Sequence, residues 1–375
     1  MRRVIVIGAG PMGIAAAIGA RDRGLDVVVL ERDDVGASLR TWGATRFFSP
    51  LHMNVSPRMR ELLGDAMPDP NALLTGPEYV DFVLTPLVER ERLRVHTLHN
   101  VIAIGRRGLT RTDYAGHPLR AERPFRVVCD NDAVFDAEIV LDASGGLVVP
   151  RAIGAGGLPA RGESRLSHAP IRTLGELMSR DLRGKRVLVV GDGHSAANAI
   201  GWLEDVEDVH VTWAIRTPNL RPCEEVPNDP LPERRAVVER ANALAASPPP
   251  FLRLERRAMI ESVAQNNGYF AVTLTGGRTI QTDCIAAFTG YKPESGYLSE
   301  LTVEVSPVTE GGARLYRAIS NITDCLTIPK VSPRDLGSGE ENFYFVGSRA
   351  YGRSRSFLLQ TGLAQLEIML DDLAS

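Results

Sequence analysis

Cysteine is scarce and scattered in this chain of 375 residues. The four cysteines are Cys129, Cys223, Cys284 and Cys325, with no C-x-x-C pair and no histidine cluster at zinc-ligand spacing. This distribution argues against a disulfide framework and against a metal centre, and we predict neither.

Long apolar runs and a strong net charge are also absent. No stretch approaches the length of a membrane span. A net charge of −3 and a pI near 6.2 give no general attraction to nucleic acid or to an anionic membrane. The chain starts with Met1-Arg2-Arg3 and passes at once into an apolar run, which leaves no room for a signal peptide. We therefore expect a cytoplasmic protein that acts on small molecules.

The overall composition is that of an ordinary globular protein, with 44% apolar and 24% charged residues. A length of 375 residues favours two domains over one. Composition leaves the oligomeric state open.

The strongest pattern lies at the N-terminus. Apolar residues 4–7 run into G-x-G-x-x-G, an alanine-rich segment and a second apolar run that ends at Glu31. This order predicts strand, turn, helix and strand. Gly8 permits the turn, Gly10 lets the backbone approach a pyrophosphate, and Gly13 allows close helix–strand packing. The helix N-terminus attracts phosphate, and the Glu31 carboxylate can accept hydrogen bonds from ribose hydroxyls. The stretch therefore predicts a dinucleotide-binding site.

A second pattern of the same kind follows the apolar run at 187–190, with Ala196 in place of the third glycine. The next predicted strand, 209–216, ends in Arg216 and has no acid there. A guanidinium pairs with a 2′-phosphate that a carboxylate would repel, so this unit predicts NADPH rather than NADH. The predicted NADP(H) contacts are Gly191, Asp192, Gly193, His194, Ser195 and Arg216.

The rest of the chain alternates strand-like and helix-like segments. Antiparallel meanders are predicted from segments 93–97, 101–104, 125–129 and 133–135, and again around 270–277. Helical spacing is found at 58–64, 77–92, 233–246 and 356–373. The Pro-, Arg- and Glu-rich segment 218–250 is interpreted as an insertion that either caps a substrate or elaborates the surface.

These patterns predict an α/β protein with two Rossmann-like, doubly wound, three-layer dinucleotide-binding domains and small antiparallel β-meanders. In their order they resemble the two-dinucleotide-binding-domain flavoproteins, which include thioredoxin reductase-like enzymes and flavin-containing, Baeyer–Villiger and N-hydroxylating monooxygenases. The resemblance covers nearly the whole chain and implies FAD on the first unit and NAD(P)H on the second. We expect a discontinuous FAD-binding domain, 1–160 plus 290–375, and an NADP(H)-binding domain, 161–289.

The motifs and the resemblance together imply an extended FAD site. Its expected contacts are Gly8, Gly10, Pro11, Met12, Gly13, Glu31, Arg32, Leu39, Arg40, Trp42, Val101, Ser144, Gly145, Gly347, Ser348, Ser356, Phe357 and Leu358. Trp42 could equally be a hydrophobic anchor. Ser348 stands where the group has an aspartate that holds the ribityl chain, so only a hydroxyl contact is expected. The closing helix is expected to aim its N-terminus, around 356–358, at the flavin N1/O2 edge.

Cysteine placement separates the branches of this group. Its disulfide reductases need a thiolate pair at the flavin, yet segments 42–44 and 168–178, the two places for one, hold no cysteine. The Baeyer–Villiger fingerprint F-x-G-x-x-x-H-x-x-x-W and the full N-hydroxylase pattern are missing too.

We therefore predict a FAD-dependent, NADPH-using monooxygenase that acts on a small molecule with O₂ through a C4a-(hydro)peroxyflavin. The alternatives are an NADPH-dependent flavin reductase or dehydrogenase with a non-O₂ acceptor, and a flavin-binding redox sensor with little turnover. Candidate catalytic residues are Arg46, Ser49 and Asn54, for which ordinary loop hydrogen bonding is the competing interpretation.

Overall fold

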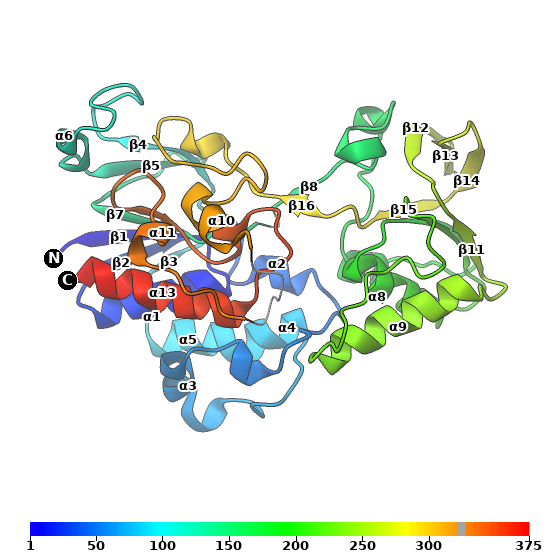
Figure 1. Cartoon of the computed structure of the whole chain (residues 1–375), viewed down its shortest axis with the longest axis horizontal. Helices are drawn as coiled ribbons and strands as arrows, with labels where there is room; N and C mark the ends of the chain where they lie inside the picture. Colours follow the sequence, from blue (N-terminus) through cyan, green and yellow to red (C-terminus); the bar gives the residue numbers. More distant parts are fainter. Residues whose placement is uncertain (147, 322–326, 375) are drawn as a thin grey trace.

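The computed structural model describes residues 1–146, 148–321 and 327–374. The chain forms two lobes joined by a two-stranded antiparallel ribbon of β8 (Val149–Pro150) and β16 (Tyr291–Lys292), and both termini lie on the first lobe (Figure 1). Each lobe contains a parallel sheet covered by helices, so the predicted α/β class with two Rossmann-like units is confirmed. The domain boundaries proposed from the sequence stay a prediction.

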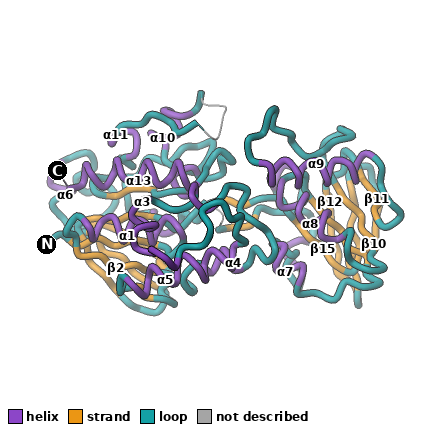
Figure 2. Tube along the Cα trace, turned by 90° about the horizontal axis from the view of Figure 1, so that it is seen from below, coloured by secondary structure: helices purple, strands orange, loops and turns teal. Residues whose placement is uncertain are grey.

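The first lobe is built around a five-stranded sheet of order β17-β7-β1-β2-β3, in which all neighbours are parallel. Its strands are β1 (Arg3–Ile7), β2 (Asp26–Leu30), β3 (Val95–His96), β7 (Ile139–Asp142) and β17 (Phe343–Phe345). Helices α1 (Pro11–Asp22) and α13 (Leu359–Ala374) lie side by side on it (Figures 1 and 2). Strand β17 and α13 come from the C-terminal part, so this lobe combines two distant segments of the chain.

The second lobe contains a four-stranded parallel sheet of order β11-β10-β9-β15. Its strands are β9 (Arg186–Val190), β10 (His210–Ala214), β11 (Leu252–Glu255) and β15 (Cys284–Ala287). Helices α8 (His194–Leu203) and α9 (Pro232–Ala246) pack against each other beside it. In the first sheet β1 lies between β2, which follows α1, and β7, which comes much later in the chain. In the second sheet β9 lies in the same way between β10, which follows α8, and β15. The two sheets therefore share this order of strands.

Each lobe also carries a three-stranded antiparallel sheet, as predicted. One contains β4 (Val101–Arg106), β5 (Phe125–Cys129) and β6 (Val134–Ala137), and the other β12 (Ile260–Asn266), β13 (Tyr269–Leu274) and β14 (Thr279–Thr282). The prediction that 93–97 belongs to the first meander is wrong. Strand β3 instead pairs with β2 in parallel, because Val29 and Leu30 extend the main sheet far enough to accept one more strand.

The remaining helices are short. They are α2 (Ala37–Arg40), α3 (Pro57–Leu63), α4 (Gly76–Tyr79), α5 (Thr85–Arg90), α6 (Pro118–Ala121), α7 (Leu174–Met178), α10 (Ala313–Ile319), α11 (Pro333–Leu336) and α12 (Ser348–Tyr351). The predicted helix at 77–92 is α4 and α5 joined by a π-helical turn, Val80–Leu84.

The closing helix starts later than predicted, at Leu359 rather than 356. The Ser354 hydroxyl accepts the Ser356 backbone N–H at 3.3 Å and lies 2.8 Å from the Ser356 hydroxyl. These contacts hold a turn just before the helix, since serine side chains compete with helical hydrogen bonding.

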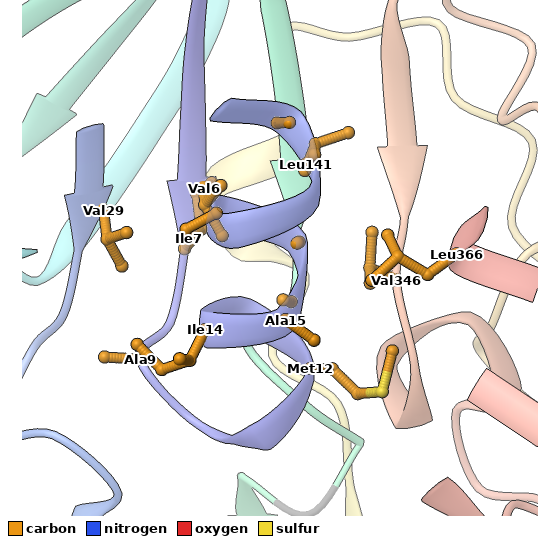
Figure 3. Close-up of a cluster of buried hydrophobic side chains, with 14 of the residues drawn as sticks. Val6, Ile7, Ala9, Met12, Ile14, Ala15, Val29, Leu141, Val346 and Leu366 are labelled. Carbon is orange, nitrogen blue, oxygen red and sulfur yellow. The ribbon is translucent and has the colours of Figure 1, made fainter. Parts of the chain in front are cut away.

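The main core lies between the first sheet and its helices. Figure 3 shows β1 side chains such as Val6 and Ile7 against Ile14 and Ala15 of α1. The small alanine side chains let α1 approach the sheet closely. Among the described residues, none of the helices combines the length and apolar composition that a membrane crossing requires.

Candidate functional site

The first glycine turn connects β1 to α1 and is fixed by close backbone contacts. Gly8 has φ = +96°, and its N–H donates to the Leu30 carbonyl at 2.7 Å. A methyl group in place of its α-hydrogen would lie 2.8 Å from the Ala143 carbonyl oxygen, and one on Gly13 would lie 1.9 Å from the Gly8 carbonyl oxygen. Only glycine fits at these two positions.

Gly10 differs from its neighbours because space is open around it. Its backbone is extended (φ = −81°, ψ = −174°), and beyond its two chain neighbours no atom of the described residues lies within 4 Å of where a methyl group would be. It caps α1 without a side chain, so N–H donors of the first helical turn stay free. The residues present therefore fit a pyrophosphate held at the helix N-terminus.

Glu31 is fixed beside this turn. Its Oε2 accepts the Ala9 N–H at 2.7 Å, and its Oε1 accepts the Asp33 N–H at 2.9 Å. Each carboxylate oxygen keeps acceptor capacity, as a role in binding a ribose requires.

The C-terminal segment closes over the first turn through Met12. The Met12 side chain is buried and points toward Val346, which follows β17, and toward Leu366 of α13 (Figure 3). A methyl group on Gly347, which has φ = +63°, would lie 2.4 Å from Met12 Cγ, and one on Gly362 would lie 3.0 Å from Met12 Sδ. These contacts bring two groups of predicted FAD residues together, although they are far apart in sequence.

A buried ionic network that sequence reasoning missed lies behind this turn. Asp142 and Arg349 are both fully buried, with Arg349 Nε 3.1 Å from Asp142 Oδ2. Tyr297 donates its hydroxyl to the same carboxylate oxygen at 2.8 Å, and the Ser144 N–H donates to Oδ1 at 3.2 Å. Burial and the Asp142 charge raise the pKa of the Tyr297 hydroxyl, which therefore stays a donor. The only sequence signal was an acid at the end of an otherwise apolar strand.

Ser348 has a contact of its own within the protein. Its hydroxyl accepts the Gly146 N–H at 3.2 Å. The hydroxyl contact to a ribityl chain stays a prediction, and it would have to share Ser348 with this bond.

The second glycine turn repeats the geometry of the first. Gly191 has φ = +120°, its N–H donates to the Ala214 carbonyl at 3.2 Å, and a methyl group on it would lie 2.5 Å from the Phe288 carbonyl oxygen. Gly193 caps α8 with an extended backbone, and apart from its chain neighbours no atom of the described residues lies within 4 Å of where its methyl group would be. This turn also fits a dinucleotide pyrophosphate.

Arg216 lies just beyond β10, beside the second turn. Its side chain is 66% exposed, and its Nε lies 3.4 Å from Asp192 Oδ2. His194, at the start of α8, has its ring centroid 5.2 Å from that of Phe48 in the other lobe. Desolvation lowers the pKa of His194, and the nearby cations Arg234 and Arg355 lower it further, so the ring is neutral near pH 7.

The proposed catalytic residues are hydrogen-bonded to other parts of the protein's own loops. Ser49 and Asn54 are buried, the Ser49 hydroxyl donates to Asn54 Oδ1 at 2.8 Å, and Asn54 Nδ2 donates to the Ser49 carbonyl at 2.9 Å. Arg46 is exposed and donates to the Leu73 carbonyl at 2.6 Å. These bonds favour the loop-structuring interpretation, and catalytic roles for the three residues stay predictions.

The loop after Glu31 packs mainly by its aromatic side chains. Trp42 is partly buried, with its ring centroid 5.0 Å from Phe47, which in turn lies 5.0 Å from Tyr79. The other predicted FAD residues of this lobe lie as follows: Leu39 and Val101 in the core, Arg32 paired with Asp33, Arg40 paired with Asp81, and Phe357 against Tyr351. Contact of these residues with a flavin stays a prediction.

The cysteines are poorly suited to thiol chemistry. Cys129, Cys223 and Cys284 are free, and desolvation raises the pKa of their thiols to about 11, about 12 and about 11, respectively. They are therefore protonated at neutral pH, whereas the thiolate is the nucleophile. Cys325 lies outside the described residues. Within the ranges 1–146, 148–321 and 327–374, no group of three His, Cys, Asp or Glu side chains is arranged to hold a metal.

Comparison with known proteins places the chain in a family. A family model described as pyridine nucleotide-disulphide oxidoreductase matches residues 5–313, so the chain belongs to this family. Membership implies an enzyme that binds FAD and a pyridine nucleotide in general terms, as expected from the sequence. No curated protein matches the sequence.

Solved structures with the same fold include reductases and monooxygenases. The bacillithiol disulfide reductase from Bacillus cereus has a TM-score of 0.68 at 18% identity, over 100% of this chain and 98% of that chain. The T. acidophilum thioredoxin reductase has a TM-score of 0.63 at 16% identity over 100% of both chains. The flavin-containing monooxygenase from Stenotrophomonas maltophilia has a TM-score of 0.60 at 17% identity, over 100% of this chain and 98% of that chain. At these identities the similarity shows the fold alone.

Proposed function

We propose that this protein is an NADPH-dependent FAD oxidoreductase that oxygenates a small molecule with O₂. FAD would be held by the domain formed by 1–160 and 290–375, and NADPH by 161–289. When bound, FAD supplies two-electron transfer from the nicotinamide and reaction with O₂. The chain's own contribution is to bind both dinucleotides at the two glycine turns and to exclude water from the flavin.

The observation that carries this proposal is the state of the thiols. Disulfide reduction in this family needs a reactive thiolate next to the flavin, but the described cysteines, Cys129, Cys223 and Cys284, have raised pKa values. Gly43 lies in one of the two segments where disulfide reductases of this group carry the cysteine pair. Here the chain packs against Gly175 of α7. A methyl group on Gly43 would lie 2.5 Å from Gly175 Cα, so a cysteine side chain does not fit there.

The experiment is anaerobic reduction of the FAD-loaded protein by NADPH, followed by mixing with oxygenated buffer. We expect faster reduction by NADPH than by NADH. We also expect a transient absorbance that belongs neither to the reduced nor to the oxidised flavin, and product formation from amines or sulfides in place of H₂O₂. A flavin that stays reduced in O₂ and is reoxidised only by another acceptor would favour the reductase alternative.

The variant Gly193→Val is a matched control. Its side chain would fill the open space at the second turn while the first turn is unchanged. It should bind FAD, resist reduction by NADPH, and react with O₂ like the wild type once reduced by dithionite. If the wild-type protein oxidises only one equivalent of NADPH, without turnover, the redox-sensor alternative is supported instead.

A further inference from the structure

Arg151 stands out because its main chain is firmly held. It follows β8 in the ribbon that joins the two lobes (Figure 1). Its N–H donates to the Gly290 carbonyl at 2.9 Å, and its carbonyl accepts the Thr289 hydroxyl at 2.8 Å and Arg172 Nη1 at 2.9 Å. Three hydrogen bonds therefore fix the point from which this side chain extends.

The Arg151 side chain lies across two glycines and has no anionic partner. A methyl group on Gly157 would lie 3.5 Å from its Nη2, and one on Gly290 would lie 3.8 Å from its Nη1. In the part of the chain that the structure describes, no carboxylate lies within ion-pair distance of its guanidinium. Its burial is partial, so the charge is only partly hydrated.

The charged groups near Arg151 are cations. Desolvation lowers the pKa of Arg151, and Arg353, Arg216 and Arg355 each lower it further. Arg353 is neutralised by Glu310 at 2.7 Å, and Arg355 has only a loose, exposed contact of 3.9 Å with Glu224. The region consequently carries an excess of positive charge, which favours an anion.

This cationic region adjoins the second glycine turn. Gly290, which lies beside the Arg151 side chain, follows Phe288 by two residues. The Phe288 carbonyl packs closely against Gly191 of the turn. Arg216 pairs with Asp192 in the same turn. Arg151 and Arg216 thus lie beyond the carboxyl ends of β15 and β10, the two strands that flank β9 and its glycine turn.

We propose that Arg151 is a second specificity-determining residue for NADPH, whose guanidinium holds the 2′-phosphate together with Arg216. The proposal rests on the proposed function, since it takes NADPH as the electron donor. A dianionic phosphate between two guanidiniums gains charge-assisted hydrogen bonds that a 2′-hydroxyl does not offer. Binding would also tie the second lobe to the ribbon between the lobes.

The test uses the FAD-loaded protein and two fragments that need no turnover, 2′,5′-ADP and 5′-AMP, with dissociation constants measured by calorimetry. Arg151→Gln should weaken 2′,5′-ADP by about tenfold and leave 5′-AMP within about twofold, because only the former carries the 2′-phosphate. Arg151→Lys should retain part of the affinity, since it keeps the charge but loses the planar fork. Arg165→Gln, an exposed arginine of the same connecting segment, is the matched control and should change neither ligand.

The outcomes separate the two proposals. If Arg216→Ala weakens 2′,5′-ADP but Arg151→Gln does not, the role of Arg151 is overturned and the NADPH assignment stands. An equal loss for both fragments in Arg151→Gln also overturns it, since the effect is then not on the 2′-phosphate. If the wild type binds the two fragments equally, the NADPH assignment itself fails. Flavin content and circular dichroism of each variant report whether the fold is intact.

Discussion

The two glycine turns share a backbone but differ in their charges. In each, the first glycine has positive φ and donates its N–H to the end of the neighbouring strand, Gly8 to Leu30 and Gly191 to Ala214. Each helix then begins after a glycine with open space in front of it. The shared parts are those that steric exclusion dictates, so they recur although the side chains around them differ.

The charges are arranged in opposite ways. In the first turn a carboxylate at the strand end, Glu31, accepts the N–H of Ala9. In the second, a carboxylate stands in the turn itself, Asp192, and pairs with a cation beyond the strand end, Arg216. The backbone register places buried Ile215 at the position of Glu31. The second unit therefore has no acid at the position that would repel a 2′-phosphate. A few side chains thus account for the expected difference in ligand preference.

The strands beside the turns differ as well. Asp142 lies opposite Ile7 at the end of β1, while Ala287 lies opposite Val190 at the end of β9. The first unit thus has a buried ion pair where the second has an apolar contact. Forming a buried ion pair costs desolvation energy, so its net contribution to stability is small. Removing one partner strongly destabilises the fold, because the other charge is left buried and unpaired.

The largest expected effect is the separate loss of each cofactor. Gly10→Val and Gly193→Val should both fold, because the backbone at each site is extended and no described atom beyond the chain neighbours lies within 4 Å of the added Cβ. The first should lose bound FAD, since its side chain fills the pyrophosphate space, and the second should keep FAD but lose NADPH. Flavin absorbance per protein and NADPH titration measure this. Normal flavin content in Gly10→Val would contradict the placement of FAD.

The next effect concerns stability. Asp142→Asn keeps the shape of the side chain but leaves Arg349 charged in a fully buried site. We expect the free energy of unfolding to fall by about 3–5 kcal/mol. Urea denaturation of the FAD-free proteins measures this without a contribution from bound cofactor. A loss below about 1 kcal/mol would mean that Arg349 finds enough compensation in its bonds to the Glu310 carbonyl and the Ser295 hydroxyl.

The sequence predicted what local patterns can determine. Both glycine turns and their flanking strands and helices were predicted because period, glycine spacing and small residues act within about 30 residues of chain. The pairing of β3 was not, since a two-residue strand carries no signal for the sheet it joins. The Asp142–Arg349 pair was not either, because its partners are 207 positions apart and the acid at the end of an apolar strand does not indicate which cation pairs with it. From the sequence, Ser49 and Asn54 were predicted to line a pocket. The hydrogen bonds between them, which the sequence does not reveal, favour a structural role.

The smallest and sharpest effect is expected at Asp192. Because its partner Arg216 is 66% exposed, Asp192→Asn should change the free energy of unfolding by no more than about 1 kcal/mol, in contrast to Asp142→Asn. The change removes a carboxylate beside the expected 2′-phosphate and frees Arg216, so NADPH should bind a few-fold more tightly while NADH is unchanged. Titration of both nucleotides at low and high salt measures this, and the gain should shrink with salt. Weaker NADPH binding would instead mean that Asp192 serves to position Arg216, and the contrast between the two turns would then lie in orientation rather than in charge.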